Sequence, residues 1–329
     1  MKKPISALVL CFIAQLSTSF GWDNPGHMAV AGLAYDELSP DQQQRLVALL
    51  NQHPDSNPVI EGFPAGRPDD QSFVMAFATW PDLIKRGHPA YKDTGYEKNE
   101  PAVQAVTFDH LMHKGWHFID TPLWVGHGAA PQQLPPAPQV NAVGVVKVLV
   151  TQLTSGEPDA AKAYDLGWLL HLVGDLHQPL HAVTGVSEAY PDGDVGGNDV
   201  VLAGETHSEP ELHAYWDDVL AKSARADKQT HHPRLDRDVQ AASHIVSALG
   251  ALPFGDDAGN LDPKAWAAES YKMAAQDVYN ITLEDISSDR GNLQATLSDD
   301  YFQTATTDAK QRIRLAGHRL ALLLKSILQ

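Results

Sequence analysis

Residues 171–181 read HLVGDLHQPLH, a dense polar cluster that directly follows an apolar run, YDLGWLL. His171 and Asp175 are four residues apart, so on a helix their side chains share one face, about one turn from each other. Pro179 should end or kink that helix, which lets His181 turn back toward the same place. Buried imidazoles and carboxylates are unfavourable unless they are paired or bind metal. The chain must therefore fold so that other segments bring partners to this cluster.

A second pair with the same spacing lies in ELHAYWDDVL, where His213 and Asp217 are also four residues apart. One such pair is a weak signal, because charged helix faces often produce it. Two pairs, the first with a histidine beyond a proline, are much harder to explain as surface residues. We expect Asp218 to face solvent, and His177 to point away from the cluster in a structural or supporting role.

The residue types in these pairs indicate a metal site. Nitrogen and carboxylate ligands without thiolate fit zinc, and several of them could hold more than one ion. The remaining ligands must come from elsewhere in the chain. The candidates are Asp82 in ATWPDLIK, His117 in GWHFID and His27 in GWDNPGH. Each of them, taken alone, could equally be a residue satisfied inside the core.

The first 21 residues, MKKPISALVLCFIAQLSTSFG, have the form of a secretory signal peptide. Two lysines precede an apolar stretch that is too short to span a bilayer, and small residues end the segment. We therefore expect a periplasmic or secreted protein that begins at Trp22. Its free α-amine and its carbonyl could together chelate a metal ion. The amine has an ordinary pKa of about 8, so a metal ion can displace its proton without great cost.

The composition limits how such a protein could bind nucleic acid. The chain has 41 acidic and 24 basic residues, a formal charge of −17, which argues against tight, sequence-independent binding to duplexes. It does not exclude a nuclease whose positive charge comes from bound metal ions. The single cysteine, Cys11, lies in the predicted signal peptide, so the exported chain would have no disulfide.

The hydrophobic pattern is helical nearly throughout, and two stretches rich in Pro and Gly, 121–139 and 184–210, read as long loops. We predict an all-α fold, a single multi-helical domain over residues 22–329 with at most a short β-hairpin. The expected helices span about 26–37, 40–52, 70–79, 140–154, 158–178, 211–222, 236–249, 263–285 and 307–328.

Taken together, these motifs resemble those of the S1/P1 nucleases, a family of zinc-dependent enzymes. The resemblance covers essentially the whole mature chain, although Pro81 departs from the usual W-A-D. It implies the fold of the phospholipase C/P1 nuclease type, and the absence of cysteine pairs leads us to expect a bacterial member. The matching pieces are Trp22-x-x-x-x-His27, W-x-D at 80–82, HFID at 117–120, HxxxDxxQPLH at 171–181, GGN at 196–198, LHxxWD at 212–217 and RLAxLL at 319–324.

The resemblance also implies a site with three zinc ions. Asp175 would bridge two of them, and Asp82, Asp175 and Lys85 would be the catalytic residues, with Lys85 neutralising charge on the phosphate. The first ion would be held by Asp82, His117, His171 and Asp175, the second by His181, His213 and Asp217, and the third by Trp22, His27 and Asp175.

By the same resemblance, Phe118, Asp120 and Asn198 would seat a base beside these ions. Stacking on Phe118 requires an unstacked base, so single strands should be preferred. We expect a monomeric hydrolase that uses a zinc-activated water to cleave single-stranded DNA and RNA to 5′-nucleotides, with 3′-nucleotidase activity.

Two other functions share part of this pattern. A zinc-dependent phospholipase C uses a similar ligand plan, and LWVG at 123–126 could serve in membrane docking. A non-catalytic periplasmic zinc-binding protein is the other alternative. Storage sites tend to lie in flexible His-rich tracts, whereas the candidate ligands here are spread from residue 22 to residue 217 and would meet only in a folded chain.

Overall fold

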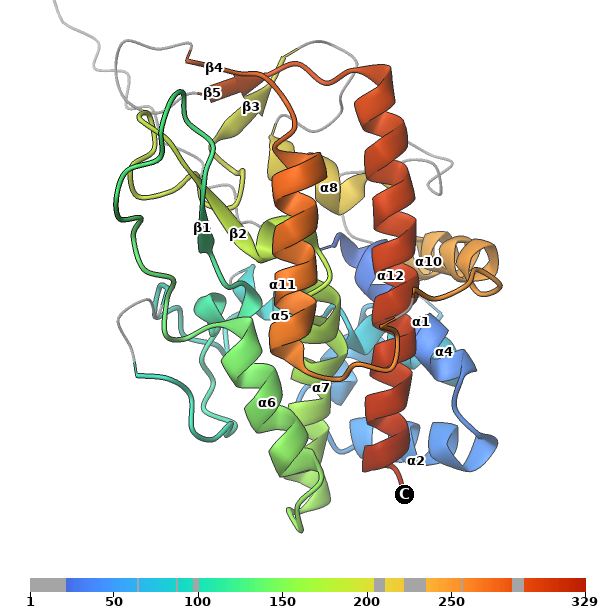
Figure 1. The fold of residues 1–329 in the computed structure, drawn as a ribbon. Coiled ribbons are helices and arrows are strands. Elements are labelled where there is room, and N and C mark those ends of the chain that lie inside the picture. Colours follow the sequence, from blue (N-terminus) through green and yellow to red (C-terminus); the bar gives the residue numbers. More distant parts are fainter. Residues whose placement is uncertain are drawn as a thin grey trace, which may run out of the picture.

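The structure is a computed structural model that describes residues 22–63, 65–86, 88–96, 101–203, 211–221, 235–255, 257–285 and 293–329. The predicted signal peptide lies outside these described residues. Helices dominate the described chain and only small sheets accompany them, which confirms the all-α prediction (Figure 1). Among the described residues, no helix combines the length and the apolar character that crossing a membrane requires.

The helices begin where the sequence carries capping signals. Ser39 caps α2 and forms a capping box with Gln42, and Pro40 occupies the first turn. The α-helices of the described residues are α1 (Asn24–Asp36), α2 (Pro40–Leu50), α3 (Ser56–Glu61), α4 (Asp70–Phe77), α5 (Trp80–Lys85), α6 (Ala142–Leu153), α7 (Asp159–Asp175), α8 (Leu212–Asp218), α10 (Leu235–Leu249), α11 (Pro263–Met273) and α12 (Asp299–Ile327). Shorter helical turns are η1 (Lys114–His117), η2 (Pro179–His181) and the π-helical η3 (Ala274–Val278).

Two predicted boundaries were wrong. The helix predicted over 263–285 ends in the π-helical turn η3, and its last residues form a strand instead. The C-terminal helix starts at Asp299 rather than at about 307, because Ser298 caps it and acidic residues fill its first turn. The short helices α3 and α5 were not predicted, since six residues are too few to show a helical period.

Helix α7 forms the centre of the bundle. It contacts α1, α2, α5, α6 and α12, and Figure 1 shows it between α6 and α12. Every residue from Ala163 to Asp175 is buried, so the helix has neighbours on all sides and no polar face. The polar residues at its C-terminal end, His171 and Asp175, are therefore held inside the molecule.

Two small sheets lie beside the helices, more than the single short hairpin that we predicted. Strand β1 (Thr121–Trp124) pairs in parallel with β2 (Val183–Val186). In the other sheet, β5 (Leu293–Ala295) lies between β3 (Val200–Leu202), to which it is parallel, and β4 (Leu283–Asp285), to which it is antiparallel. Strands β1, β2 and β3 fall at or inside the stretches that we predicted as loops.

The β1–β2 pairing brings two of the motifs together. Just before the strands, the amide of Ile119 donates to the carbonyl oxygen of His181 over 2.8 Å, and the amide of Thr121 donates to that of Ala182 over 3.1 Å. The HFID stretch therefore runs alongside the QPLH stretch. This contact places His117 next to the end of α7.

Candidate active site

The end of α7 brings the first predicted ligands together. The helix ends at Asp175, four residues earlier than Pro179, and the chain then turns into η2. The turn carries His181 back, as predicted, so that its Nδ1 lies 3.4 Å from Oδ1 of Asp175. Residues from four other segments, α1, α5, η1 and α8, meet this turn.

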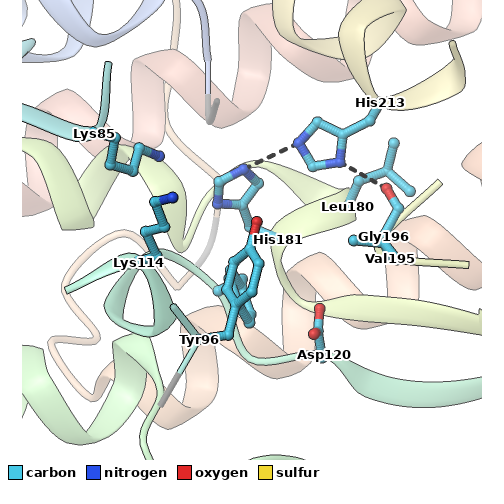
Figure 2. Close-up of a pocket in the computed structure, with 10 residues that line it drawn as sticks. Lys85, Tyr96, Lys114, Asp120, Leu180, His181, Val195, Gly196 and His213 are labelled. Atoms are coloured by element: carbon cyan, nitrogen blue, oxygen red, sulfur yellow. Dashed lines mark hydrogen bonds between the residues drawn. The ribbon is translucent and has the colours of Figure 1, made fainter. Parts of the chain in front are cut away.

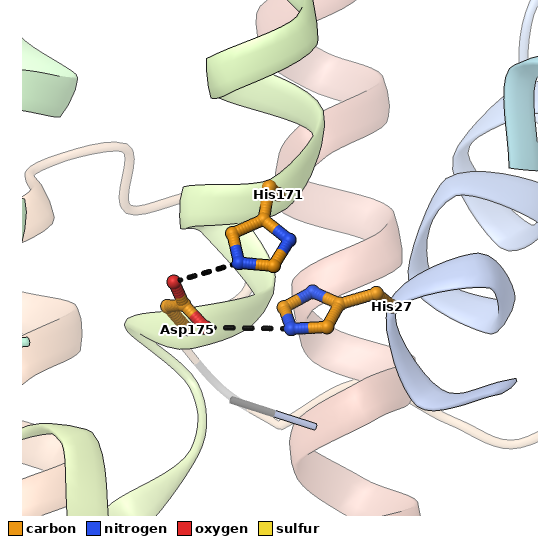
Figure 3. A group of neighbouring side chains, drawn as sticks. All are labelled: His27, His171 and Asp175. Carbon is orange, nitrogen blue, oxygen red and sulfur yellow. Dashed lines mark ion pairs between the residues drawn. The ribbon is translucent and has the colours of Figure 1, made fainter. Parts of the chain in front are cut away.

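Eight predicted ligands lie in three buried groups whose potential ligand atoms are within 4.8 Å of one another. Figure 3 shows the first group, in which His27 from α1 faces the end of α7. The second group joins α5, η1 and α7. The third joins η2 and α8. The groups are His27, His171 and Asp175; Asp82, His117 and His171; and His181, His213 and Asp217.

Asp175 lies between these groups. Its Oδ2 is 3.0 Å from Nδ1 of His117 and 3.2 Å from Nε2 of His171. Its Oδ1 is 3.4 Å from Nε2 of His27 and 3.4 Å from Nδ1 of His181. One carboxylate with both oxygens facing different histidines has the geometry of a bridging ligand.

Three of the histidines are oriented by backbone carbonyl oxygens. Nδ1 of His171, His181 and His213 donates to the carbonyls of Ala78, His117 and Gly196, over 2.7, 2.7 and 2.6 Å. Metal-binding histidines usually donate their second ring N–H in this way, which fixes the tautomer. The arrangement leaves Nε2 of each ring, a lone pair in the neutral form, turned toward the groups.

The donor set fits a cation. Nε2 of His213 lies 3.2 Å from Nε2 of His181 and 3.5 Å from Oδ2 of Asp217. Two imidazole lone pairs that face each other at this distance repel unless a positive charge lies between them. Both ring nitrogens of His27 and Oδ2 of Asp82 are buried without a hydrogen-bond partner among the described residues. Such unmet groups are rare in a folded protein, and metal ions would satisfy them.

At three of the ligands the electrostatic balance favours metal-binding protonation states. At two others it does not, because Asp175 and Asp82 outweigh burial and raise the pKa of His171, and burial raises the pKa of Asp217. Burial, followed by the neighbouring His171, lowers the pKa of His27 to about 4. Burial and the Lys85 ammonium lower the pKa of His117 to about 3. Burial alone would raise the pKa of Asp175, but His171 and His181 outweigh it and hold that pKa well below its usual range. Neutral imidazoles and ionised carboxylates are the forms that bind metal.

Lys85 is part of this site rather than a solvated helix residue. It is 7% exposed, and its Nζ lies 2.8 Å from Oδ1 of Asp82, one turn earlier in α5. It also lines a pocket of about 220 Å³ that opens beside His181 and His213 (Figure 2). The other residues that line this pocket are Tyr96, Lys114, Phe118, Asp120, Leu180, Val195 and Gly196.

Two of the predicted base-binding residues line the pocket and one does not. Phe118 contacts Tyr96, with ring centres 5.7 Å apart, and Asp120 is buried with a positive φ of 51°. Asn198 is absent from the lining, because its side-chain amide donates to the carbonyl oxygen of Val195 over 2.6 Å. In this structure it supports the pocket wall instead of facing the pocket.

Sequence reasoning missed Asp194, which holds the loop that carries Val195. Its Oδ1 accepts hydrogen bonds from the amides of Gly185 and Gly197 at 2.7 and 3.0 Å, and its Oδ2 accepts from the Tyr279 hydroxyl at 2.7 Å. These bonds support a φ of 56° at Val195, a strained value for a β-branched residue. An acid two residues before a Gly-Gly pair was the only local signal of this role.

Trp22 lies against the ligand-bearing helices. Its side chain is 1% exposed, and the amide of Asp23 donates to the carbonyl oxygen of Asp217 in α8 over 3.1 Å. A Cβ added to Gly174 would stand 2.7 Å from Nδ1 of His27 and 3.7 Å from Cδ1 of Trp22. The glycine therefore lets both residues approach α7. Chelation by the Trp22 amine stays a prediction.

The neighbours of the ligands have structural roles. His177 points away from the groups, as predicted: its Nδ1 donates to the carbonyl oxygen of Val173 and its Nε2 lies 2.9 Å from Nη1 of Arg319. Gln178, which we did not single out, donates to Oδ1 of Asp217 over 2.6 Å. The prediction that Asp218 faces solvent was wrong, because α8 is covered on nearly all sides and Asp218 is buried with it.

Comparisons with known proteins cover the same part of the chain. A family model described as S1/P1 nuclease matches residues 22–329. The chain is 25% identical to Endonuclease 3 of Arabidopsis thaliana, over 96% of this chain and 92% of that protein. It is 25% identical to Endonuclease 5 of the same plant, over 98% and 95%. It is also 25% identical to Nuclease S1 of Aspergillus oryzae, over 97% and 94%.

Proposed function

The chain belongs to the S1/P1 nuclease family, and on that premise we propose that it cleaves single-stranded DNA and RNA to 5′-nucleotides and also removes the phosphate of 3′-nucleotides. The family membership confirms the resemblance seen in the sequence and makes the protein a hydrolase of the nuclease type. Substrate form and products are the parts that we propose. The observation that carries the proposal is the convergence of three buried His/Asp groups on Asp175, beside an open pocket.

The proposed cofactor is three zinc ions, one for each group. Asp82, His117, His171 and Asp175 would hold the first, His181, His213 and Asp217 the second, and the Trp22 terminus, His27 and Asp175 the third. Zinc, when bound, supplies an activated water at neutral pH and offsets charge on the phosphoryl group. The donor set supports zinc, because it combines imidazole and carboxylate without thiolate.

The chain's own residues would orient the substrate. Lys85 is held by Asp82 at 2.8 Å and lines the pocket, so its ammonium can neutralise charge on the scissile phosphate. Phe118 would stack on the base that enters the pocket, with Asp120 next to the base edge. Stacking of this kind requires a base free of its own helix, which supports a preference for single strands.

Other features of the proposal concern the whole protein. We propose that residues 22–329, the span of the family match, form one catalytic domain that acts as a monomer in the periplasm or outside the cell after removal of residues 1–21. Neither a phospholipase C nor a zinc-storage protein is favoured, since the matched relatives are named as nucleases.

Activity assays on four substrates test this proposal. The mature protein is loaded with zinc and given single-stranded DNA, RNA, the same DNA as a duplex, and a 3′-mononucleotide. We expect rapid cleavage of both single strands, slow cleavage of the duplex, release of phosphate from the mononucleotide, and loss of all activity after chelation. Equal rates on duplex and single-stranded DNA would contradict the stacking argument, and hydrolysis of phosphatidylcholine alone would replace the nuclease by a phospholipase.

A further inference from the structure

A second lysine reaches the pocket beside Lys85. Lys114 is the first residue of the 3-10 helix η1, three residues before the predicted ligand His117. Residues i and i+3 of a 3-10 helix lie one above the other, so Lys114 lies on the same side of η1 as His117. Figure 2 shows the amino groups of Lys114 and Lys85 pointing toward the same region, next to His181.

The two lysines differ in how their charge is used. The Lys85 side chain is 5% exposed and lies against Asp82, whose carboxylate is itself in a metal-site group. The Lys114 side chain is 17% exposed, and its Nζ lies 2.6 Å from Oδ2 of Asp93, which is 50% exposed. Water screens an ion pair with a half-exposed partner, so this pair is weak. An ammonium has three N–H donors, and Asp93 occupies one of them.

We propose that Lys114 forms a second phosphate subsite, which binds the phosphate next to the scissile one in an oligonucleotide. The inference rests on the proposed function. With a formal charge of −17, the chain as a whole repels a polyanion. A lysine ammonium that points into the pocket therefore contributes strongly to binding of the substrate. Lys114 is thus a binding residue that selects for a neighbouring phosphate. The subsite would not distinguish sequences, because phosphate contacts carry no base information.

Three dinucleotides separate this role from binding of the scissile phosphate. The substrates are TpT, which has only the scissile phosphate, and pTpT and TpTp, which add one phosphate on the 5′ or the 3′ side. Only cleavage of the internal phosphodiester is scored, because the 3′-phosphate of TpTp is itself a proposed substrate. The variants are Lys114→Met, which keeps the length and removes the charge, and Lys114→Arg, which keeps the charge. Lys92→Met is the matched control, because Lys92 is an exposed lysine of the neighbouring segment and does not line the pocket.

We expect Lys114→Met to lower the ratio of kcat/KM for one phosphorylated dinucleotide to that for TpT by about tenfold, mainly through KM. Lys114→Arg should restore most of the ratio, and Lys92→Met should leave it as in the wild type. The substrate that responds identifies the side on which the subsite lies. Binding of phosphorothioate dinucleotides that resist hydrolysis, measured by calorimetry on the zinc-loaded protein, should show the same selective loss.

Two results would overturn the subsite. An equal loss for all three dinucleotides would mean that Lys114 acts at the scissile phosphate or maintains the shape of the pocket. No loss for any of them would mean that Lys114 serves only its ion pair with Asp93. Failure of the zinc-loaded wild type to cleave any dinucleotide would overturn the proposed function and the subsite with it. This result can be told apart from the two above, because it is seen without any substitution.

Discussion

His213 donates from its Nδ1 to the carbonyl oxygen of Gly196 over 2.6 Å. The bond connects the metal-site group on α8 to the loop that forms one wall of the pocket. Because it fixes the ring, Nε2 of His213 is held 3.2 Å from Nε2 of His181. The position of a predicted metal ligand therefore depends on the conformation of a glycine seventeen residues away.

Replacement of Gly196 by alanine tests this dependence. Gly196 has a φ of +62°, and an added Cβ would stand 2.8 Å from the carbonyl oxygen of Leu180. We expect Gly196→Ala to displace the loop, to lower the free energy of unfolding by about 1–3 kcal/mol, and to reduce the zinc content by about one ion per chain. Calorimetry and elemental analysis measure the two effects.

Gly128→Ala is the control for that variant. Gly128 also has a positive φ, of +87°, but nothing lies within 4 Å of an added Cβ. It should show backbone strain alone and keep its full zinc content. If both variants bind as much zinc as the wild type, the carbonyl of Gly196 does not position His213.

Asp194 should be as important as the ligands for the shape of this loop. Both oxygens of the Asp194 carboxylate accept hydrogen bonds, one from the Gly185 amide and one from the Tyr279 hydroxyl. An asparagine amide has only one acceptor oxygen, so its NH₂ group would face one of these donors. We expect Asp194→Asn to lower kcat/KM on single-stranded DNA by at least about tenfold. The exposed neighbour Asp192 provides the control, and Asp192→Asn should keep normal activity. Comparable activity of the two variants would contradict a role for Asp194.

The predicted N-terminus can be tested by adding one residue. Trp22 is buried beside α7 and α8, so an extra residue before it would occupy the place of the free amine. We expect a chain that starts with Ala before Trp22 to bind about one zinc ion fewer than the chain that starts at Trp22, and to keep its circular dichroism spectrum. Unchanged zinc content and turnover would remove the amine from the ligand set.

Stability should depend on pH through Asp165 of α7. Burial, followed by Glu157, raises the pKa of Asp165 to about 8, above its value of about 3.9 in the unfolded chain. The folded chain thus keeps a proton that the unfolded chain loses. The contribution of this bound proton to the free energy of unfolding is fully present below about pH 4 and is lost as the pH rises through about 8.

Asparagine at this position cannot lose a proton. Asp165→Asn should therefore gain stability relative to the wild type between pH 5 and pH 9, by roughly 1–3 kcal/mol in urea unfolding. Asp159→Asn, on the exposed first turn of the same helix, should show no such gain. If the free energies of unfolding of Asp165→Asn and the wild type differ by the same amount at pH 5 and at pH 9, the pKa of Asp165 is not raised.

The sequence predicted best what depends on spacing within one helix. The pairs His171–Asp175 and His213–Asp217 were visible because a separation of four places both side chains on one face. The pairing of β1 with β2 was not visible, because it joins segments about sixty residues apart that carry no alternating pattern.

The walls of the pocket were hidden for the same reason. Asp194 shows its role only through hydrogen bonds to Gly185 and Tyr279, and Lys114 only through its place above His117. Burial of Asp218 could not be read from the helical period of α8, because elements distant in sequence cover that helix. Tertiary contacts of this kind leave no local trace.

The central claim is that three buried groups bind three zinc ions, two of which share Asp175. A crystal structure of the protein starting at Trp22, with anomalous data collected on both sides of the zinc edge, tests it most directly. We predict three zinc peaks, with the Asp175 carboxylate bridging two of them and His181, His213 and Asp217 around the other. Peaks outside these groups, or an Asp175 that contacts a single ion, would contradict the account.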